Sequence, residues 1–311
     1  MAKLDIIGIP RALLYYKYRY LWECFFKELG CHILLSPETN KEIMDQGINH
    51  SIDESCLSAK IYMGHIYAII NQVDYIFVPR FCNFARQETV CTKFNALYDI
   101  VRNTFPHKEV LHYNVDVLKR NGELKGFIKM GLALKKNFFL IVKAYIKAKL
   151  KQKHHDKLAH KQQADLINNE SCLKMLIVAH PYNRYDKLVG FPIIKYLMEN
   201  NIMPVYADIV DHKVARQRSL NISKTLHWTY SKELIGAIDY YQDKIDGIIF
   251  ISTFPCGPDS LVNELCLRKI KYVPMLNLVL DELQGEAGLH TRLESFIDII
   301  KIRKNKQEAV S

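Results

Sequence analysis

The sequence lacks the short motifs that would identify a nucleotide or zinc site by themselves. Neither Gly-x-x-x-x-Gly-Lys-Ser/Thr nor Gly-x-Gly-x-x-Gly occurs, so the P-loop and the common dinucleotide fingerprint are absent. No Cys-x-x-Cys pair occurs either, which excludes zinc ribbons and ferredoxin sites whose ligands are close in sequence. If ATP takes part in the chemistry, we expect it to act on a partner protein.

Long apolar runs and secretory features are missing as well. The run from Phe138 to Val142 is far too short to cross a bilayer, and no apolar stretch follows the opening Met-Ala-Lys. We therefore expect a soluble, cytoplasmic protein whose eight cysteines are reduced thiols rather than a disulfide framework. With 311 residues, of which 49% are hydrophobic, the chain is long enough for two α/β domains or one large one.

Charge of one sign is concentrated in the middle of the chain. The formal net charge is +10, and eleven lysines crowd the segment from Lys125 to Lys161. A solvated helix face, a docking surface for an acidic partner and a site for the phosphates of a nucleotide-like ligand all remain open. The sharper hypothesis is an exposed helix that steers a partner electrostatically. Nucleic acid is not expected because no recognised motif or aromatic platform accompanies the lysines, and no membrane contact is expected either.

Strands and helices alternate in both halves of the sequence. The expected strands are Leu4–Ile9, His32–Leu35, Asp74–Val78, Leu173–Ala179, Met203–Ala207, Gly247–Ser252 and Tyr272–Leu276. The pattern predicts an α/β fold with two Rossmann-like domains, each a doubly wound parallel sheet, and with a cleft between them. The expected boundaries are 1–114 for the N-terminal α/β domain, 115–170 for a lysine-rich helical connector and 171–311 for the C-terminal α/β domain.

Three cysteines stand where a metal site would need them. Cys56, Cys91 and Cys256 are expected in loops after strands or in the first turn of helices, where unpaired N–H groups and the helix dipole favour a thiolate. Three thiolates from separate segments cannot close a tetrahedral zinc site, but they can hold an iron–sulfur cluster with one iron open. Core packing remains the alternative for each. Of the other cysteines, we expect Cys24 and Cys266 within helices and Cys31 and Cys172 at the starts of strands. Cys82 is expected in the loop that leads to Cys91.

Charged residues near these cysteines are the candidate catalytic groups. Glu54 and Lys60 flank Cys56, and Glu286 lies in an acidic stretch with glycines, 281–288. Carboxylates there would act as acid/base groups or would hold loops in place, and both interpretations remain open. A nucleophilic cysteine would also suit position 256, but it needs a histidine base, for which topology offers only His180.

Several longer motifs occur in the order typical of one protein family. They are Ile9-Pro10-Arg11-Ala12-Leu13, Cys56-Leu57-Ser58-Ala59-Lys60, Val78-Pro79-Arg80, Cys91-Thr92-Lys93-Phe94, His180-Pro181-Tyr182-Asn183, Cys256-Gly257-Pro258-Asp259-Ser260, Gly285-Glu286-Ala287-Gly288 and Thr291-Arg292-Leu293-Glu294. With them the chain resembles the activase-associated branch of the 2-hydroxyacyl-CoA dehydratase and double-cubane protein superfamily. The resemblance covers nearly the whole chain and is weakest over the lysine-rich middle.

The resemblance implies two α/β domains with an iron–sulfur cluster between them, either a [4Fe–4S] cubane or a double cubane. Its ligands here would be Cys56, Cys91 and Cys256, and its electrons would come at low potential from an ATP-hydrolysing activase. A CoA thioester substrate and a homologous subunit or second copy of the chain would accompany it, and the alternative is a non-catalytic cluster-binding, regulatory or assembly subunit. Two departures bear on activity: Thr92 stands where the family more usually has proline, and Leu283 where it commonly has histidine.

Overall fold

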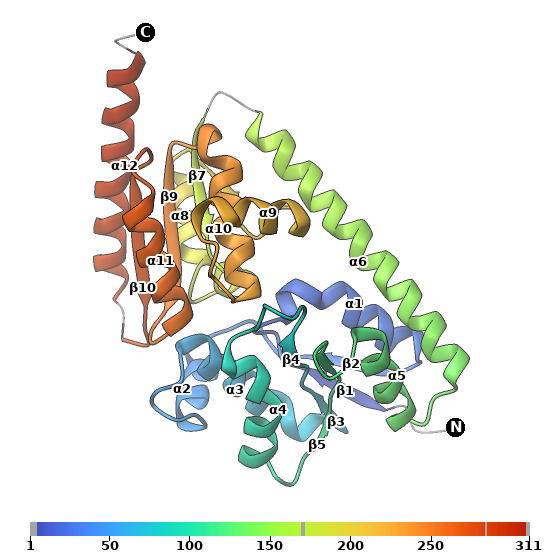
Figure 1. Ribbon diagram of the computed structural model, residues 1–311. Coiled ribbons are helices and arrows are strands. Elements are labelled where there is room, and N and C mark those ends of the chain that lie inside the picture. The colour runs from blue at the N-terminus through green and yellow to red at the C-terminus, as the bar shows by residue number, and fades with distance from the viewer. Residues whose placement is uncertain (1–4, 169–171, 284, 309–311) are drawn as a thin grey trace. The chain divides into compact units, whose positions relative to one another are not determined.

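The computed structural model describes residues 5–168, 172–283 and 285–308. Contacts divide the chain into two compact units (Figure 1). The first unit comprises Met1–Leu158 with His227–Thr229, and the second comprises Ala159–Leu226 with Tyr230–Ser311. Each unit contains a four-stranded sheet in which every pairing is parallel, which confirms the mixed α/β fold with parallel sheets.

The sheet of the first unit has the strand order β2-β1-β3-β5. The strands are short, and the central two, β1 and β3, are the most buried: β1 (Ile6–Ile9), β2 (His32–Leu35), β3 (Tyr75–Phe77) and β5 (Glu109–Leu111). A separate two-stranded parallel sheet pairs β4 (Arg80–Asn83) with β6 (Asn114–Asp116). Near-continuous apolar sequences such as that of β1 are typical of parallel strands, because helices cover both faces of the sheet.

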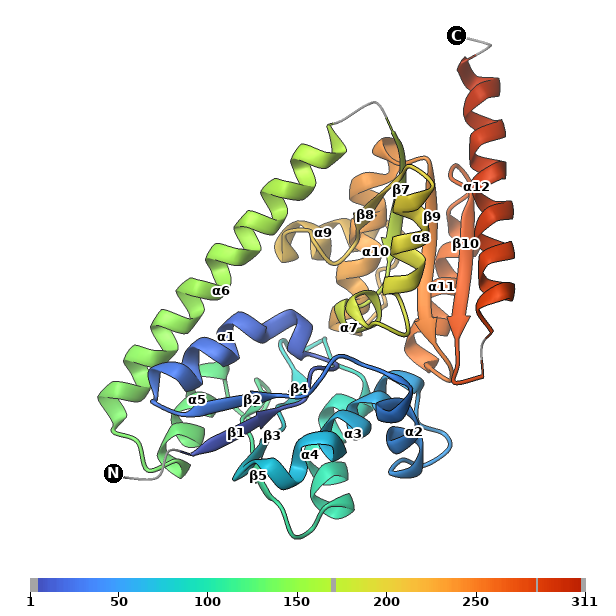
Figure 2. The same cartoon turned by 180° about the vertical axis from the view of Figure 1, so that it is seen from behind.

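Helices cover the first sheet on both faces, as Figure 2 shows. Right-handed crossovers place α1 on one face and α3 and α4 on the other, because the chain moves outward from β1 to β2 and then back past β1 to β3. The helices are α1 (Tyr15–Glu28), α2 (Lys41–Asn49), α3 (Leu57–Ile69), α4 (Thr92–Thr104) and α5 (Glu123–Ala133).

An aromatic core joins α1 to the sheet and to α5. The Trp22 ring packs edge-on against Phe77 at 4.9 Å, and its indole N–H donates to the Tyr113 hydroxyl at 3.0 Å. Phe25 meets Phe127 of α5 edge-to-face at 4.7 Å. The hydrogen bond satisfies two polar groups that would otherwise be buried without partners, so this apolar cluster can include Trp and Tyr.

Two glycines let α2 and α3 approach backbone to backbone. A Cβ at Gly64 would lie 1.8 Å from the Ile43 carbonyl oxygen, and one at Gly47 would lie 2.0 Å from the Lys60 carbonyl oxygen. No side chain larger than hydrogen fits at either position without moving a helix. This contact holds α2 directly against α3.

The sheet of the second unit has the strand order β10-β9-β7-β8. Its strands are β7 (Leu173–Val178), β8 (Ile202–Tyr206), β9 (Gly247–Thr253) and β10 (Met275–Leu280). Its helices are α7 (Pro181–Tyr185), α8 (Phe191–Glu199), α9 (His212–Ile222), α10 (Thr229–Tyr241), α11 (Gly257–Lys269) and α12 (Glu286–Glu308). All residues of β9 are buried, as expected of a central strand.

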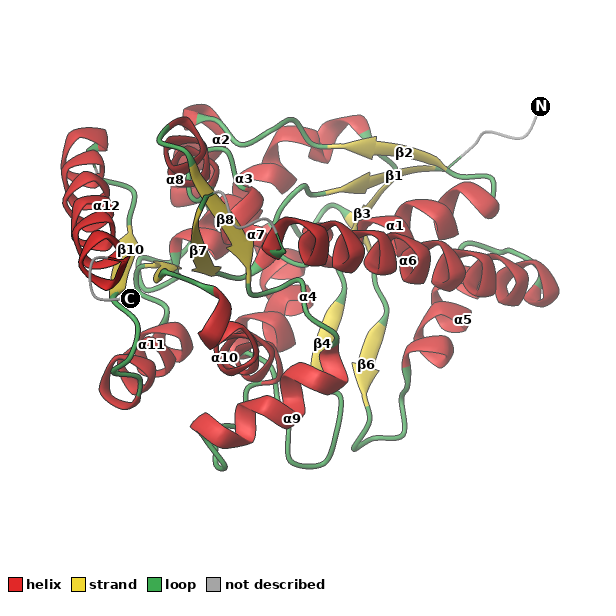
Figure 3. Cartoon of the chain, turned by 90° about the horizontal axis from the view of Figure 1, so that it is seen from above, coloured by secondary structure: helices red, strands yellow, loops and turns green. Residues whose placement is uncertain are grey.

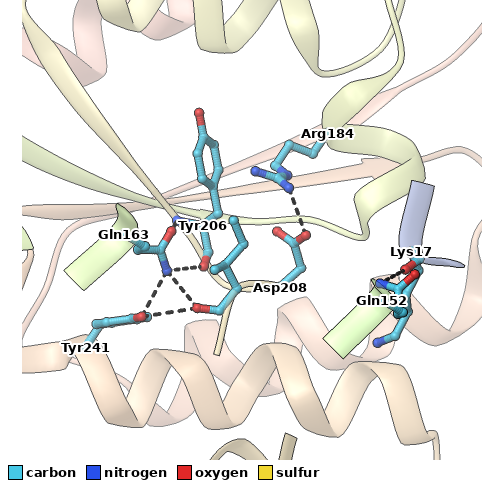
Figure 4. A network of polar contacts seen from close by, with 8 residues as sticks. Lys17, Gln152, Gln163, Arg184, Tyr206, Asp208 and Tyr241 are labelled. Atoms are coloured by element: carbon cyan, nitrogen blue, oxygen red, sulfur yellow. Dashed lines mark hydrogen bonds and ion pairs between the residues drawn. The ribbon is translucent and has the colours of Figure 1, made fainter. Parts of the chain in front are cut away.

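The helix α6 (Phe138–Ile167) contributes to both units. Its buried Gln152 accepts from the Leu21 backbone N–H at 3.1 Å and donates to the Lys17 carbonyl at 3.2 Å, which fixes α6 to α1. Its buried Gln163 donates to the carbonyl of Tyr206 at 2.8 Å and accepts from the N–H of the same residue at 2.9 Å (Figure 4). Among the described helices none has the length and apolar character to cross a bilayer.

The observed elements differ from the expected ones in several places. The helices α2, α4 and α9 and the strands β4 and β6 were not expected, and Cys82 lies in β4 rather than in a loop. The last strand starts at Met275 because Pro274 has no N–H to donate to a sheet. The apolar pattern of the sequence predicts a final helix over Leu293–Ile300, and the observed helix starts seven residues earlier, at Glu286.

Candidate functional site

Each four-stranded sheet has a topological switch point, where ligands of such folds bind at the carboxyl ends of the strands. In the first unit it lies between β1 and β3, and in the second between β7 and β9, because successive strands are added on opposite sides there. The residues that follow these four strands are therefore the first candidates for a site.

In the second unit the switch point holds a cysteine, an aspartate and a histidine. Cys256 is the N-cap of α11, and its thiol donates a hydrogen bond to the carboxylate of Asp259, three residues on. The same carboxylate lies 3.0 Å from Nε2 of His180, the N-cap of α7. The histidine expected near Cys256 is thus present, but its bond goes to Asp259, which stands between the thiol and the imidazole.

The aspartate and the histidine are both buried, with side chains 9% and 8% exposed. Burial alone would raise the pKa of Asp259, but the charge of His180 and the hydrogen bonds from His180 and Cys256 hold this pKa below its ordinary value. The Tyr182 ring stacks on His180 at 5.0 Å and orients it. These contacts join the loops after β7 and β9 into one buried polar cluster.

In the first unit, two cysteines occupy equivalent positions on neighbouring helices. Cys56 is the N-cap of α3 and Cys91 is the N-cap of α4, and both are partly exposed. The Nζ of Lys93, in the first turn of α4, donates to the Ser55 hydroxyl at 3.0 Å. This bond ties the residue before Cys56 to the beginning of the helix that Cys91 caps.

A buried histidine supports α3 from within. His65 of α3 lies 2.8 Å from the Ser36 hydroxyl through Nδ1 and 3.0 Å from the Thr39 hydroxyl through Nε2. Ser36 in turn accepts from the Arg11 backbone N–H at 2.7 Å. Burial, with a smaller effect of the Arg11 charge, lowers the pKa of His65 from 6.5 to about 3. The network binds the segments after β1 and β2 to the helix that Cys56 begins.

A small apolar cavity of about 10 Å³ lies at the first switch point, room for roughly one water molecule. It is lined by residues that follow β1, by Phe77 and Pro79 of the β3 end, by Tyr62 of α3 and by Leu97 of α4. The Tyr62 hydroxyl is buried and has no hydrogen-bond partner among the described residues. Burial raises the pKa of Tyr62, so the hydroxyl stays protonated.

The other expected site residues lie apart from such clusters. Glu54 is exposed and does not cap α3, whose N-cap is Cys56. Lys60 is buried within α3, only 4% exposed. Glu286 begins α12, and nothing is described of its side chain. Leu283 is 90% exposed, and Thr92 is the first residue of α4 after Cys91.

Of the remaining cysteines, Cys24, Cys31 and Cys266 are buried, and Cys82 and Cys172 are partly exposed. Burial raises the pKa of the Cys24 and Cys31 thiols and raises that of Cys266 to about 12, so these thiols stay protonated in the core. Cys82 in β4 donates to the Asn95 side chain at 2.9 Å, and burial raises its pKa too. No cysteine of the described residues forms a disulfide, and within that part of the chain no three His, Cys, Asp or Glu side chains gather as a metal-binding group.

Asp259 and His65 are the site residues that sequence reasoning missed. The spacing Cys256-x-x-Asp259 was a usable signal, because residue N3 of a helix commonly bonds back to its N-cap residue. No comparable signal marks His65, whose partners Ser36 and Thr39 are far from it in sequence.

Comparisons with known proteins identify a family for most of the chain. Residues 6–210 match the family described as CoA enzyme activase uncharacterised domain (DUF2229), a match that includes Cys56 and Cys91 and ends before Cys256. No curated protein matches the chain. A solved structure titled "Crystal structure of ZnuA" has a TM-score of 0.27 and 7% identity, with 96% of this chain and 99% of that chain covered. A TM-score this low supports no conclusion about fold or ligand.

Proposed function

The chain belongs to the family of CoA enzyme activase domains, and from this premise we propose that it is an iron–sulfur protein. In this proposal it accepts low-potential electrons from an ATP-dependent activase for reductive or radical chemistry on a small substrate such as a CoA thioester. Family membership supports the link to CoA-enzyme activation and an activase-type partner. The cluster, the electron transfer, the cytoplasmic location and the need for a homologous subunit or second copy are parts of the proposal.

We propose Cys56, Cys91 and Cys256 as the ligands. The observation that carries this choice is that each of the three is the N-cap of a helix. The first N–H groups of a helix and its dipole favour negative charge at that place, so a thiolate is stabilised there. The buried cysteines Cys24, Cys31 and Cys266 have the opposite property, a raised pKa.

Cysteine thiolates are the ligands that an iron–sulfur cluster would need at these positions. When bound, such a cluster supplies one-electron transfer at low potential and, with three protein thiolates, leaves one iron with an open position. Around the ligands, Lys93 places a cation in the first turn after Cys91, and His180 forms a hydrogen bond with the Asp259 carboxylate beside Cys256. Both contacts hold the ligand loops to neighbouring elements, which is the supporting role that outer residues play at metal sites.

Further parts of the sequence-based interpretation remain proposals. The strand order of each sheet supports two Rossmann-like domains, and the division at 114 and 170 with a helical connector belongs to the same proposal. Glu54, Lys60 and Glu286 remain proposed catalytic groups, although the burial of Lys60 leaves its ammonium little access to solvent. The alternative is a non-catalytic, cluster-binding or regulatory subunit.

Anaerobic purification followed by iron and acid-labile sulfide analysis tests the proposal. Cys56→Ala, Cys91→Ala and Cys256→Ala should each abolish or severely reduce the iron content. The matched control is Cys266→Ala in the same helix as Cys256, which should keep its iron and lose only about 1 kcal/mol of stability. Equal iron in all four variants would refute the ligand assignment, and iron without activase-dependent reduction would favour the non-catalytic alternative.

A further inference from the structure

One face of α6 carries apolar and basic side chains directed away from the core of the first unit. The underside of the helix is buried at Ile141, Ala144 and Ala148. The opposite face, by helical spacing, carries Phe139, Lys143, Ile146, Leu150, Lys153 and Lys157, here called the α6 ridge. Among its apolar side chains, Phe139 is 80% exposed, Ile146 is 52% exposed and Leu150 is 64% exposed. In Figure 3, α6 faces the viewer along most of its length.

The charge along α6 is predominantly positive, although Asp156 lies next to Lys157. From residue 124 to residue 155 the sequence has nine lysines and no aspartate or glutamate. Lys147 and Lys149 are ion-paired with Glu28 at 2.6 Å and Glu123 at 2.7 Å, so their charge is partly neutralised. The ridge lysines are exposed and, within the described residues, form no ion pair. The ridge therefore combines uncompensated cations with large exposed apolar side chains.

We propose that the α6 ridge binds the surface of an anionic lipid bilayer, with Phe139, Ile146 and Leu150 entering the boundary between headgroups and acyl chains. Basic helices with aromatic and aliphatic side chains on the exposed face bind such surfaces, and clusters of lysines strengthen the binding. The sequence alone predicted no membrane contact. The exposure of the three apolar side chains is what changes that expectation.

The composition of the ridge favours lipid over a protein partner. Protein interfaces are enriched in arginine and depleted in lysine, because the planar guanidinium makes paired hydrogen bonds that an ammonium does not. Between residues 121 and 183 the chain has no arginine, so all positive side chains there that stay charged at neutral pH are lysines. An anionic bilayer attracts any cationic side chain near its surface, and this attraction does not require paired hydrogen bonds. Residues on the ridge lie within the first unit, so the proposal does not depend on the proposed cluster or on the second unit.

Sedimentation of the full chain with lipid vesicles tests the proposal. The chain should bind vesicles that contain about 30% phosphatidylglycerol at low salt, and should bind pure phosphatidylcholine vesicles far less. The variant Lys143→Gln/Lys153→Gln/Lys157→Gln should bind anionic vesicles roughly 100-fold more weakly. Phe139→Ser should weaken binding roughly 10-fold. Glutamine has nearly the helix propensity of lysine, so α6 should remain folded, which circular dichroism checks.

The matched control removes the same charge elsewhere. Lys213→Gln/Lys224→Gln/Lys271→Gln changes three exposed lysines of the second unit. If this control loses as much vesicle binding as the ridge variant, the effect is one of net charge and the proposal is wrong. Absence of binding to anionic vesicles at low salt would also overturn it. So would a ridge variant with normal vesicle binding but slower activase-dependent reduction, which would assign the lysines to an acidic protein partner.

Discussion

Acidification should destabilise this protein through His65. The ring is buried, hydrogen-bonded at both nitrogens by Ser36 and Thr39, and near the charge of Arg11. Its pKa falls from 6.5 to about 3, chiefly through burial, so the folded state holds the neutral ring where the unfolded chain already takes up a proton. A group with a lowered folded pKa contributes stability that is present above its unfolded pKa and is lost as the pH falls toward the folded one.

The size of the effect follows from the two pKa values. Below pH 6.5 the unfolded state gains about 1.4 kcal/mol per pH unit relative to the folded state, until the folded ring itself is protonated near pH 3. Between pH 7 and pH 5 the His65 contribution to the free energy of unfolding should therefore fall by about 2 kcal/mol. That is a large part of the stability of an ordinary domain.

Urea unfolding at pH 7 and pH 5 measures this loss. Since other groups also titrate, the comparison is with His65→Gln, which lacks the titrating ring but keeps a polar side chain between Ser36 and Thr39. The variant should lose about 2 kcal/mol less than the native protein over the same interval. Equal pH dependence in the two proteins would refute the reasoning, whatever the absolute stability of the variant.

Two further predictions concern elements near the candidate site. Gly64→Ala should lower the free energy of unfolding by about 2 kcal/mol or more, because the Cβ would lie 1.8 Å from the Ile43 carbonyl oxygen and the overlap outweighs the usual gain of alanine in a helix. In Gly122→Ala, where no atom lies within 4 Å of the added Cβ, thermal unfolding should be nearly unchanged, and equal losses in both variants would contradict the packing argument. Asp211 caps α9 and accepts from the backbone N–H of Val214 and Lys213, bonds that lower its pKa, so Asp211→Ala should cost about 1 kcal/mol at pH 7. A lowered pKa gives stability that is fully present above the unfolded value and is lost as the pH falls through the folded one, so that cost should begin to shrink as the pH falls below about 4. A variant as destabilised at pH 2 as at pH 7 would show that the cap acts otherwise.

The alternation of strands and helices could be predicted from the sequence because its signal is local. The predicted strand His32–Leu35 coincides with β2, and Gly247–Ser252 is β9 without its last residue. Continuous apolar runs between glycine and proline residues are enough to indicate buried parallel strands. The same local signal predicted helix beginnings at Cys56 and Cys256, and both residues are N-caps. Cys91 was expected at the end of a loop, and it caps α4, a helix that the pattern did not predict.

The elements that the sequence did not predict depend on partners distant in the chain. Strand β4 exists because Arg80 pairs in register with Asn114, and neither segment has a strand pattern of its own. Helix α2 is positioned by the glycine contact with α3, which amino-acid propensity does not indicate. Such features are decided by packing between segments, which overrides local preference.

By itself, then, the sequence determined the α/β class and the positions of Cys56 and Cys256 at helix beginnings, because hydrophobic periodicity and turn residues act over a few neighbouring residues. Only the tertiary structure decided that the Asp259 carboxylate accepts a hydrogen bond from the Cys256 thiol and contacts His180. It likewise decided that Lys93 donates a hydrogen bond to Ser55 and that His65 is buried between two hydroxyl groups. It also decided which face of α6 is exposed. The reason is physical: hydrogen bonds and burial depend on which segments meet in space, and chain positions far apart in sequence meet only after the fold has formed.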